Sequence, residues 1–467
     1  SKLVAVKNNL VDMVWGNEKP PRPTDVVQSL ALKYCGDSME HKISKIRQEM
    51  ITNACTALVV TALDEVAWLF NLRGADIPYN PVFFAFALVT ADEVVLYIDQ
   101  HKLPQDWNES STKITVTVKA YSDFISDLES RKYTETVWVG PSYSQAVADA
   151  LTSCNLCEDA SPICHAKSIK NDVELQGMKA CHLRDSVALA EYFLWLETEL
   201  ASGSTISEAA AADKLESLRA EQKDFVSLSF PTISSTGANG AVIHYNPKHG
   251  SCRNISASDV YLCDSGGQYK DGTTDVTRTV HFGTPTDHER DVFTRVLKGH
   301  ISLATTKFPK GTTGLHLDSF ARRALWDVQL DYAHGTGHGV GSFLNVHEGP
   351  HGIGLRLSHG KHALKPGMTV TIEPGYYEVN NFGARIENVV EVKATGTGEG
   401  WMRFEPFTLF PIQAKMINID LLSLAEISWI DEYHTQTQAA IAPLLQQQGR
   451  TEALAWMEKH TRALLQK

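Results

Sequence analysis

Cysteine is scarce in this chain, and no long apolar run is present. Eight cysteines among 467 residues are too few for the disulfide framework of a small secreted protein. The most apolar stretch, residues 81–98, is broken by Asp92 and Glu93, whereas a membrane-spanning helix needs about 20 apolar residues. We therefore expect a reduced, cytoplasmic environment and no membrane partner.

Basic residues are also in short supply. The chain has 43 Lys and Arg against 55 Asp and Glu, which gives a net charge of −12. Nucleic-acid-binding proteins usually carry a basic excess, so we expect no nucleic-acid partner. Hydrophobic residues make up 43% and charged residues 21%, as in ordinary globular proteins, which excludes collagen-like, coiled-coil and largely disordered chains. The length predicts two or three domains.

The first part of the chain divides into a lead-in and an α/β unit. Residues 1–26 are expected to be an irregular, linker-like segment, because three prolines between Glu18 and Thr24 oppose helix formation. Residues 27–167 are expected to form one α/β domain, with β-branched runs such as 56–61 as buried strands.

The rest of the chain, residues 168–467, is expected to form a second, larger domain that ends in a helical tail. Asn171 and Glu174 are three positions apart, a spacing that resembles a capping box and predicts a helix start. Thr205 and Glu208 repeat the spacing and predict the start of the next helix.

Two aspartates are the first candidates for chemistry. Asp264 ends a strand-like run, glycines and an Asp-Gly pair then reverse the chain, and Asp275 opens the next strand-like run. Two strands joined in this way would place both carboxylates on one face. Such a pair repels unless a cation lies between its members, although on their own these could equally be two solvated turn residues.

Histidines and glutamates follow at similar positions. The run from His334 to Gly341 holds His338 and four glycines, which allow close approach of the backbone to a ligand, although a flexible loop with incidental histidines would look the same. Glu373 ends a strand-like run before Pro-Gly, and Glu387 stands inside an apolar one. Glutamate is rarely buried without a partner.

Together these residues predict a site for two divalent cations. Four carboxylates and one imidazole would be strongly destabilising if buried without cations. An oxygen-rich set without thiolate favours Mn²⁺, with Co²⁺ or Fe²⁺ as alternatives, over structural Zn²⁺. Two cations about 3.5–4 Å apart would hold a bridging water and lower its pKa. The proposed ligands are Asp264, Asp275, His338, Glu373 and Glu387.

Longer motifs carry a family resemblance. Asp264-Ser-Gly-Gly-Gln-Tyr-Lys-Asp-Gly-Thr-Thr-Asp275 resembles the first ligand motif of the pita-bread metallopeptidases, and the run from His334 to His347-Glu-Gly-Pro is similar to the long, eukaryotic-type Xaa-Pro aminopeptidases within that group. The resemblance implies an α+β fold, a pita-bread catalytic domain preceded by a creatinase-like α/β domain. The first domain of the long form is expected to be missing.

The resemblance also implies an activity and residue roles. A metal-bridging hydroxide would attack the Xaa-Pro carbonyl and release the N-terminal residue of peptides with proline second. Asp275 and Glu387 would bridge the two cations, with Asp264 on one and His338 and Glu373 on the other. Glu373 would also be the general base. His347 and His244 would be catalytic residues that stabilise the tetrahedral intermediate and contact substrate. His334, also counted as catalytic, would lie in the substrate pocket. Tyr377 is expected to support substrate binding, and Arg385 to support a ligand carboxylate.

Other functions remain open at this point. A prolidase, which cleaves Xaa-Pro dipeptides, is a close enzymatic alternative. A metal-free creatinase and a non-catalytic pita-bread binding module are disfavoured because all five ligands stand in the sequence. Family members commonly form homodimers, so we expect a homodimer that acts on peptide substrates.

Overall fold

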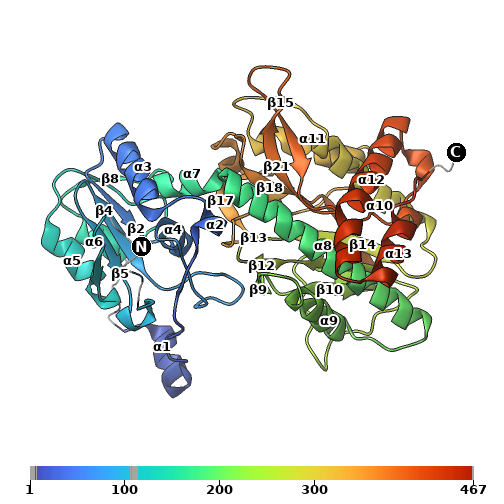
Figure 1. The fold of residues 1–467 in the computed structure, drawn as a ribbon, viewed down its shortest axis with the longest axis horizontal. Helices are drawn as coiled ribbons and strands as arrows, with labels where there is room; N and C mark the ends of the chain where they lie inside the picture. The colour runs from blue at the N-terminus through green and yellow to red at the C-terminus, as the bar shows by residue number, and fades with distance from the viewer. Residues whose placement is uncertain (1–5, 7, 106, 108–113, 465–467) are drawn as a thin grey trace.

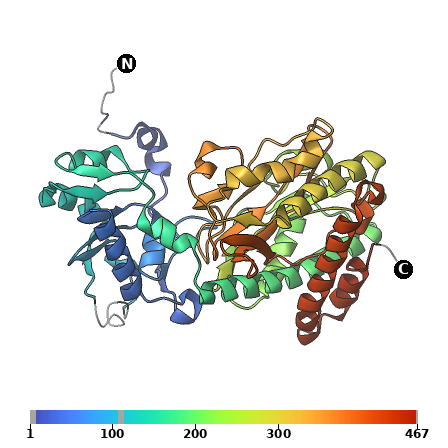
Figure 2. The same cartoon turned by 90° about the horizontal axis from the view of Figure 1, so that it is seen from above.

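The chain folds into two bodies that lie side by side (Figure 1). The computed structural model describes residues 6, 8–105, 107 and 114–464. The N-terminal body occupies one end of the molecule, and the larger body, which ends at the C-terminus, occupies the other (Figures 1 and 2). Within the described residues, no helix combines the length and apolar character that crossing a bilayer requires.

The N-terminal body is built on a six-stranded mixed sheet in the order β6-β5-β4-β2-β7-β8. The β2–β7, β7–β8 and β5–β6 pairs are parallel, whereas β4 runs antiparallel to both neighbours. The strands are β2 (Ala57–Val60), β4 (Phe86–Thr90), β5 (Val94–Tyr97), β6 (Thr117–Lys119), β7 (Thr136–Trp138) and β8 (Asn155–Cys157).

Strand β2 shows why this sheet is covered on both faces. Its four residues are all buried, because alternate side chains enter different cores. Leu58 and Val60 join one apolar cluster, and Ala57 and Val59 join another. The first cluster includes side chains of α3 (Met39–Thr52), α4 (Leu63–Leu69) and α7 (Pro162–Ser168); the second includes side chains of α5 (Phe124–Arg131) and α6 (Gln145–Ala150).

A smaller feature of this body becomes important for the site. Strand β3 (Leu72–Arg73) pairs antiparallel with β1 (Gln28–Ser29), next to the short helix α2 (Leu32–Cys35). This segment lies at the side of the N-terminal body that meets the larger body (Figure 1).

The larger body contains four sheets. One has the order β10-β11-β14, a second β13-β12-β9, and a third β15-β22-β21-β18-β16-β17, while β19 and β20 form a hairpin. The strands are β9 (Phe225–Leu228), β10 (Ile233–Thr236), β11 (Val260–Ser265), β12 (Gly267–Tyr269), β13 (Gly272–Thr273), β14 (Val276–His281), β15 (Phe308–Pro309), β16 (Gly337–Gly339), β17 (Glu348–Ile353), β18 (Thr369–Ile372), β19 (Gly375–Glu378), β20 (Phe382–Arg385), β21 (Asn388–Ala394) and β22 (Trp401–Pro406).

Helices pack around these sheets. The longest, α8 (Asp172–Ala201), starts beside the N-terminal body and runs along the larger body (Figure 1). The others are α9 (Glu208–Ala220), α10 (Asp287–Ala304), α11 (Gly314–Trp326), α12 (Leu424–Gln447) and α13 (Thr451–His460). The last two form the helical tail expected at the C-terminus, and α13 packs against α8.

Two local predictions were wrong. Residues 1–26 are not wholly irregular, because Leu10–Trp15 form helix α1, whose first turn is capped by the Asn9 side chain. Helix α9 is capped by Ser207 rather than Thr205. Glu208, taken as half of that capping box, is fully buried and accepts hydrogen bonds from Thr236 N and the Tyr245 hydroxyl instead.

The capping box at the start of α8 is confirmed and gives a stability test. Asn171 Oδ1 accepts from the backbone of Val173 and Glu174, while Asn171 Nδ2 donates to the Cys35 carbonyl, 2.8 Å away in the N-terminal body. We expect Asn171→Ala to destabilise the protein by about 1–2 kcal/mol, seen as a lower thermal unfolding midpoint. Asn171→Asp keeps the cap but loses the Cys35 contact, so its unfolding midpoint should lie between those of the unmodified protein and Asn171→Ala. An unchanged midpoint for Asn171→Ala would contradict this role of Asn171.

Candidate metal centre

Strand pairing brings the two predicted aspartates together. β11 pairs antiparallel with β14, with Asp264 opposite Thr277 and Ser265 opposite Val276. Asp275 directly precedes β14, so it lies beside Asp264 as expected. The intervening residues form β12 and β13, which join a separate sheet.

The other candidates come from the six-stranded sheet. Glu387 directly precedes β21, and Glu373 directly follows β18; these two strands pair with Ile372 opposite Asn388. His338 lies in β16, whose Gly339 pairs with Val370 of β18. Two antiparallel sheets thus deliver the five predicted ligands to one place from strand ends that are far apart in sequence.

Interatomic distances show how closely three of them meet. Asp275, His338 and Glu387 each place one ligand atom within 4.8 Å of the other two. His338 Nε2 also lies 3.4 Å from Asp275 Oδ2 and 3.5 Å from Glu373 Oε1. His338 Nδ1 donates to the Gly339 carbonyl at 2.9 Å, which leaves Nε2 as the acceptor nitrogen that a cation requires.

Glycine makes room for this arrangement. A Cβ on Gly337 would lie 1.9 Å from the Thr371 carbonyl oxygen, a clash that no packing adjustment relieves. The glycine at 337 thus allows close approach to the backbone of strand β18, whereas the expected approach to a ligand stays a prediction.

The carboxylates strongly perturb one another. Burial raises the pKa of Asp275 well above its usual value, and the charges of Asp264 and Glu373 raise it further. Burial likewise raises the pKa of Glu387, followed by the charges of Asp275 and Glu373. The pKa of Glu373 is also raised by burial, against the opposing effect of His338. These groups resist ionisation together unless positive charge is added.

One cation of the protein already serves the site. Arg385 Nη2 donates to Asp264 Oδ2 at 2.7 Å, and Arg385 Nη1 donates to the Tyr377 hydroxyl at 2.5 Å. The Tyr377 hydroxyl in turn lies 2.9 Å from His334 Nε2. Arg385 thus contacts the carboxylate of the predicted ligand Asp264, and Tyr377 links His334 to the same chain of hydrogen bonds.

The remaining predicted residues lie around this centre. The ring of His347 contacts that of His338 edge to face, with centroids 4.2 Å apart. His334 is half-buried, and burial followed by the nearby Arg385 lowers its pKa to about 3, so it is neutral at physiological pH. His244 follows β10 in the loop before Tyr245 and has an exposed side chain; its charge lowers the pKa of both His334 and His347, which places it nearby.

Sequence reasoning missed the threonines that support the carboxylates. Thr277 Oγ1 donates to Glu387 Oε2 at 2.7 Å, and Thr371 Oγ1 donates to Glu373 Oε1 at 3.2 Å. Each stands two positions from a predicted ligand in its own chain segment: Thr277 from Asp275, and Thr371 from Glu373. Since side chains two apart share a face of a strand, the same alternation could have identified them.

The residues present fit two divalent cations. Asp264 Oδ1 is buried and has no hydrogen-bond partner within the described part of the chain, so a carboxylate oxygen is available at the centre. Positive charge would also relieve the repulsion that raises the pKa values of Asp275 and Glu387. The donor set of carboxylate oxygens with one imidazole suits a hard or intermediate cation.

Family models match most of the chain. Residues 18–174 match the creatinase/prolidase N-terminal domain, residues 176–394 match metallopeptidase family M24, and residues 400–464 match the C-terminal region of peptidase M24.

Individual relatives match nearly the whole chain. A probable Xaa-Pro aminopeptidase P from Laccaria bicolor is 50% identical over 98% of this chain and 73% of its own length. One from Coprinopsis cinerea is 49% identical over 99% of this chain and 77% of its own length. The crystal structure of X-prolyl aminopeptidase from Caenorhabditis elegans, described as a cytosolic enzyme with a di-nuclear active site, has a TM-score of 0.94 and 38% identity; the match covers 98% of this chain and 76% of that one.

Metal binding gives a test with a defined pH dependence. In the metal-free protein the folded-state pKa values of Asp275 and Glu387 are raised, so the stability they contribute is present at low pH and lost as pH rises through the folded values. Bound cations remove this loss. We therefore expect Mn²⁺ to raise the thermal unfolding midpoint more at pH 7.5 than at pH 5.5, and Glu387→Gln to reduce the bound metal, measured by elemental analysis, from about two per chain to one or none. An equal shift at both pH values would contradict the assignment.

Proposed function

We propose that this chain, which belongs to metallopeptidase family M24, is an aminopeptidase that removes the N-terminal residue from peptides whose second residue is proline. The observation that carries the proposal is the convergence of four carboxylates and His338 at one centre, in a chain 50% identical to a probable Xaa-Pro aminopeptidase P over nearly its whole length. An α+β fold with a creatinase-like N-terminal domain and a pita-bread catalytic domain positions that centre.

The resident cofactor is a pair of divalent metal ions, for which we propose Mn²⁺. Asp264, Asp275 and Glu387 would hold one, and His338 and Glu373 would hold the other, with Asp275 and Glu387 shared. The oxygen-rich donor set supports manganese. When bound, such ions polarise a carbonyl oxygen and lower the pKa of water, so that hydroxide is available at neutral pH.

Glu373 is the proposed general base. It lies at the centre, 3.5 Å from His338 Nε2, at the end of a buried strand that fixes its backbone. Its carboxylate would accept a proton from the attacking water and return it to the leaving proline nitrogen. That return matters for this substrate, because an Xaa-Pro bond has no amide N–H that other peptidases could recognise, and the proline nitrogen must gain a proton to leave.

The three histidines around the centre are proposed to contact substrate in two ways. His334 donates from Nδ1 to the Gly335 carbonyl and accepts from Tyr377 at Nε2, so both ring nitrogens are occupied and its ring face is what remains for an apolar proline ring. His347 and His244 have exposed side chains. We assign to them the hydrogen bonds that stabilise the tetrahedral intermediate.

Further parts of the proposal concern the setting of the enzyme. We propose domains over residues 27–167 and 168–467 after the lead-in 1–26; the change of family model between residues 174 and 176 lies close to this division. We also propose that the chain is cytoplasmic, supported by its sparse cysteines and by the cytosolic C. elegans enzyme, and that it forms a homodimer, which sedimentation would test.

Substrate length distinguishes this function from that of a prolidase. We expect the Mn²⁺-loaded protein to release the first residue of a tripeptide Xaa-Pro-Pro faster than it cleaves the dipeptide Xaa-Pro, and to leave the matched peptide Xaa-Ala-Pro intact. Chromatographic analysis of the products would measure both rates. A clear preference for the dipeptide would replace the proposal with a prolidase activity, and no cleavage of any Xaa-Pro peptide would overturn it.

The role of Glu373 is tested by removing its charge. Glu373→Gln keeps the shape but cannot take up a proton, so kcat should fall by about 10²–10⁴-fold or more. Glu378→Gln is a matched control, since Glu378 lies in the neighbouring strand β19 and pairs with His288 at the surface; its kcat should be unchanged. Elemental analysis of both variants shows whether a loss of activity comes from a loss of bound metal or from the loss of the general base. Full activity of Glu373→Gln would refute the assignment of Glu373.

A further inference from the structure

The loop that carries His347 is embedded in the N-terminal body. This loop, residues 341–347, connects β16 to β17 and is called the His347 loop below. Its Leu344 is 1% exposed and belongs to the apolar core of the N-terminal body. Its Phe343 packs with Leu30 and Cys35, also of that body. The loop is therefore part of the hydrophobic packing of the N-terminal body.

Arg73 adds polar contacts to the same loop. It stands in β3, is 3% exposed, and donates from Nε to the Phe343 carbonyl at 2.5 Å and from Nη2 to the Ser342 carbonyl at 3.3 Å. Phe343 has a positive φ of 49°, a conformation that non-glycine residues adopt only when their surroundings favour it. The contacts from Arg73 and the apolar packing supply those surroundings.

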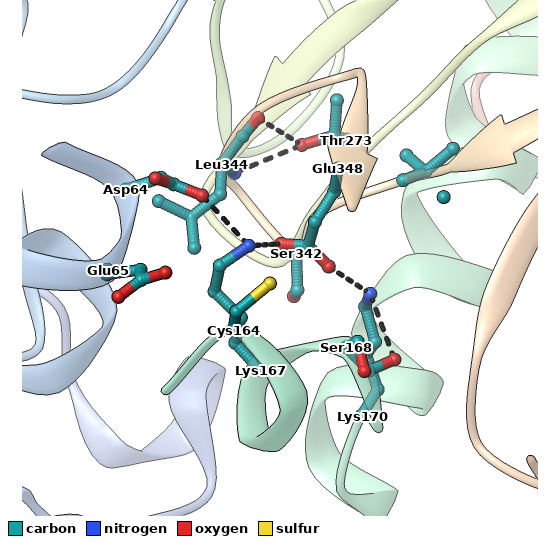
Figure 3. Close-up of polar contacts among 12 residues, drawn as sticks. Asp64, Glu65, Cys164, Lys167, Ser168, Lys170, Thr273, Ser342, Leu344 and Glu348 are labelled. Carbon is teal, nitrogen blue, oxygen red and sulfur yellow. Dashed lines mark hydrogen bonds and ion pairs between the residues drawn. The ribbon is translucent and has the colours of Figure 1, made fainter. Parts of the chain in front are cut away.

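A buried ionic cluster holds the end of the loop. Glu348 directly follows His347, and its side chain is fully buried. Lys170 Nζ lies 2.6 Å from Glu348 Oε1. Lys167 Nζ lies 2.9 Å from Glu348 Oε2 and 2.8 Å from Asp64 Oδ2. Figure 3 shows these side chains converging from three segments: α4, the region of α7, and the start of β17. We refer to Asp64, Lys167, Lys170 and Glu348 as the Glu348 cluster.

The charges of this cluster balance, and each depends on the others. Both lysine side chains are at most 2% exposed. Burial alone would raise the pKa of Glu348, but Lys167 and Lys170 lower it below the usual value. Two carboxylates and two ammonium groups thus compensate one another. Loss of one partner would leave a buried charge uncompensated, which favours movement of Glu348 toward solvent.

Movement of Glu348 would carry His347 with it. Consecutive residues share a peptide plane, and the ring of His347 contacts that of His338, with centroids 4.2 Å apart. Glu348 also pairs through its backbone with Gly339, the residue after His338. The position of the His347 ring relative to the metal centre therefore depends on where the Glu348 carboxylate is held.

We propose that Lys167, at the end of the N-terminal domain, and Lys170, just beyond it, are positioning residues for catalysis, which act through Glu348 to hold His347 at the metal centre. The proposal rests on the proposed function, in which His347 contacts the substrate. It gives the creatinase-like domain a part in turnover in addition to any part in binding. Because His347 is assigned to the tetrahedral intermediate, its displacement affects kcat more than KM.

The first experiment compares two buried lysines. Lys167→Met removes one cation of the cluster and keeps an unbranched apolar side chain. Lys102→Met is the matched control, because Lys102 is 3% exposed and pairs with buried Asp76 in the same body. With saturating Mn²⁺ and an Xaa-Pro-Pro peptide, we expect kcat of Lys167→Met to fall at least about 10-fold with KM nearly unchanged, and Lys102→Met to keep its kcat. Equal kcat losses in both variants would show that the Glu348 cluster only stabilises the fold, and would overturn the proposal.

A double-mutant cycle tests whether the effect passes through His347. If Lys167 acts by positioning His347, Lys167→Met should cause no further loss of kcat in a His347→Ala background. Additive losses would show that Lys167 acts on turnover by another route and would refute the proposal. Should Lys167→Met not fold, Lys170→Met makes the same test from the other oxygen of Glu348.

A readout without turnover keeps this inference separate from the proposed function. In the metal-free protein, the Cε1–H NMR resonance of His347, assigned by its loss in His347→Ala, should shift or broaden in Lys167→Met but not in Lys102→Met. An unmoved resonance in Lys167→Met contradicts the positioning role even if the enzyme is active. If the unmodified chain cleaves no Xaa-Pro peptide, the proposed function fails, while a shifted resonance would still support the coupling between the cluster and His347.

Discussion

The structure depends on one electrostatic constraint, which is that four carboxylates meet where water is largely excluded. Burial and mutual repulsion raise the pKa values of Asp275 and Glu387 together, while Arg385 brings a positive charge to hydrogen-bond distance of Asp264. Such a cluster is stable in the folded protein only if bound cations compensate its negative charge. The cations that compensate this charge in the folded state are therefore also the ones that the proposed reaction uses.

The Glu348 cluster solves a similar problem by a different route. There, two carboxylates face two lysines of the protein itself, and the charges cancel without any added ion. The two arrangements lie at opposite ends of a short segment: His338 belongs to the first and Glu348 to the second. One buried cluster needs added cations, and the other is neutralised by Lys167 of the N-terminal domain and by Lys170 just beyond it. The segment between them is therefore held at both ends.

Sequence reasoning was accurate where function and local pattern coincide. Asp264 and Glu373 could be identified because each ends an apolar run. Glu387, expected inside a strand, lies just before β21, and the structure brings all three near Asp275 and His338. The capping box at Asn171 is equally local, and it was identified. The Thr205 prediction failed because two residues, Thr205 and Ser207, offer capping hydroxyls. Spacing alone also does not show that Glu208 accepts hydrogen bonds from β10 and the loop after it.

The long-range contacts had no such signal. Lys167 and Glu348 are separated by 181 positions, and Arg73 and Phe343 by 270. Nothing in the local sequence distinguishes a solvated lysine side chain from one buried against a distant glutamate. The supporting threonines are an intermediate case, since alternation along the strand from a predicted ligand does point to Thr277 and Thr371.

The division between strands and loops also bears on how the site works. The predicted ligand carboxylates lie in or directly beside paired strands, whose backbone pairing restricts their positions, as cation binding demands. The residues assigned to substrate, His244 and His347, stand on loops, which can adjust to a peptide. A loop that adjusts freely, however, would lose the orientation that transition-state contacts need. Anchoring the His347 loop in a second domain resolves this conflict, because the loop gains rigidity from outside without tightening the sheet that holds the metal ligands.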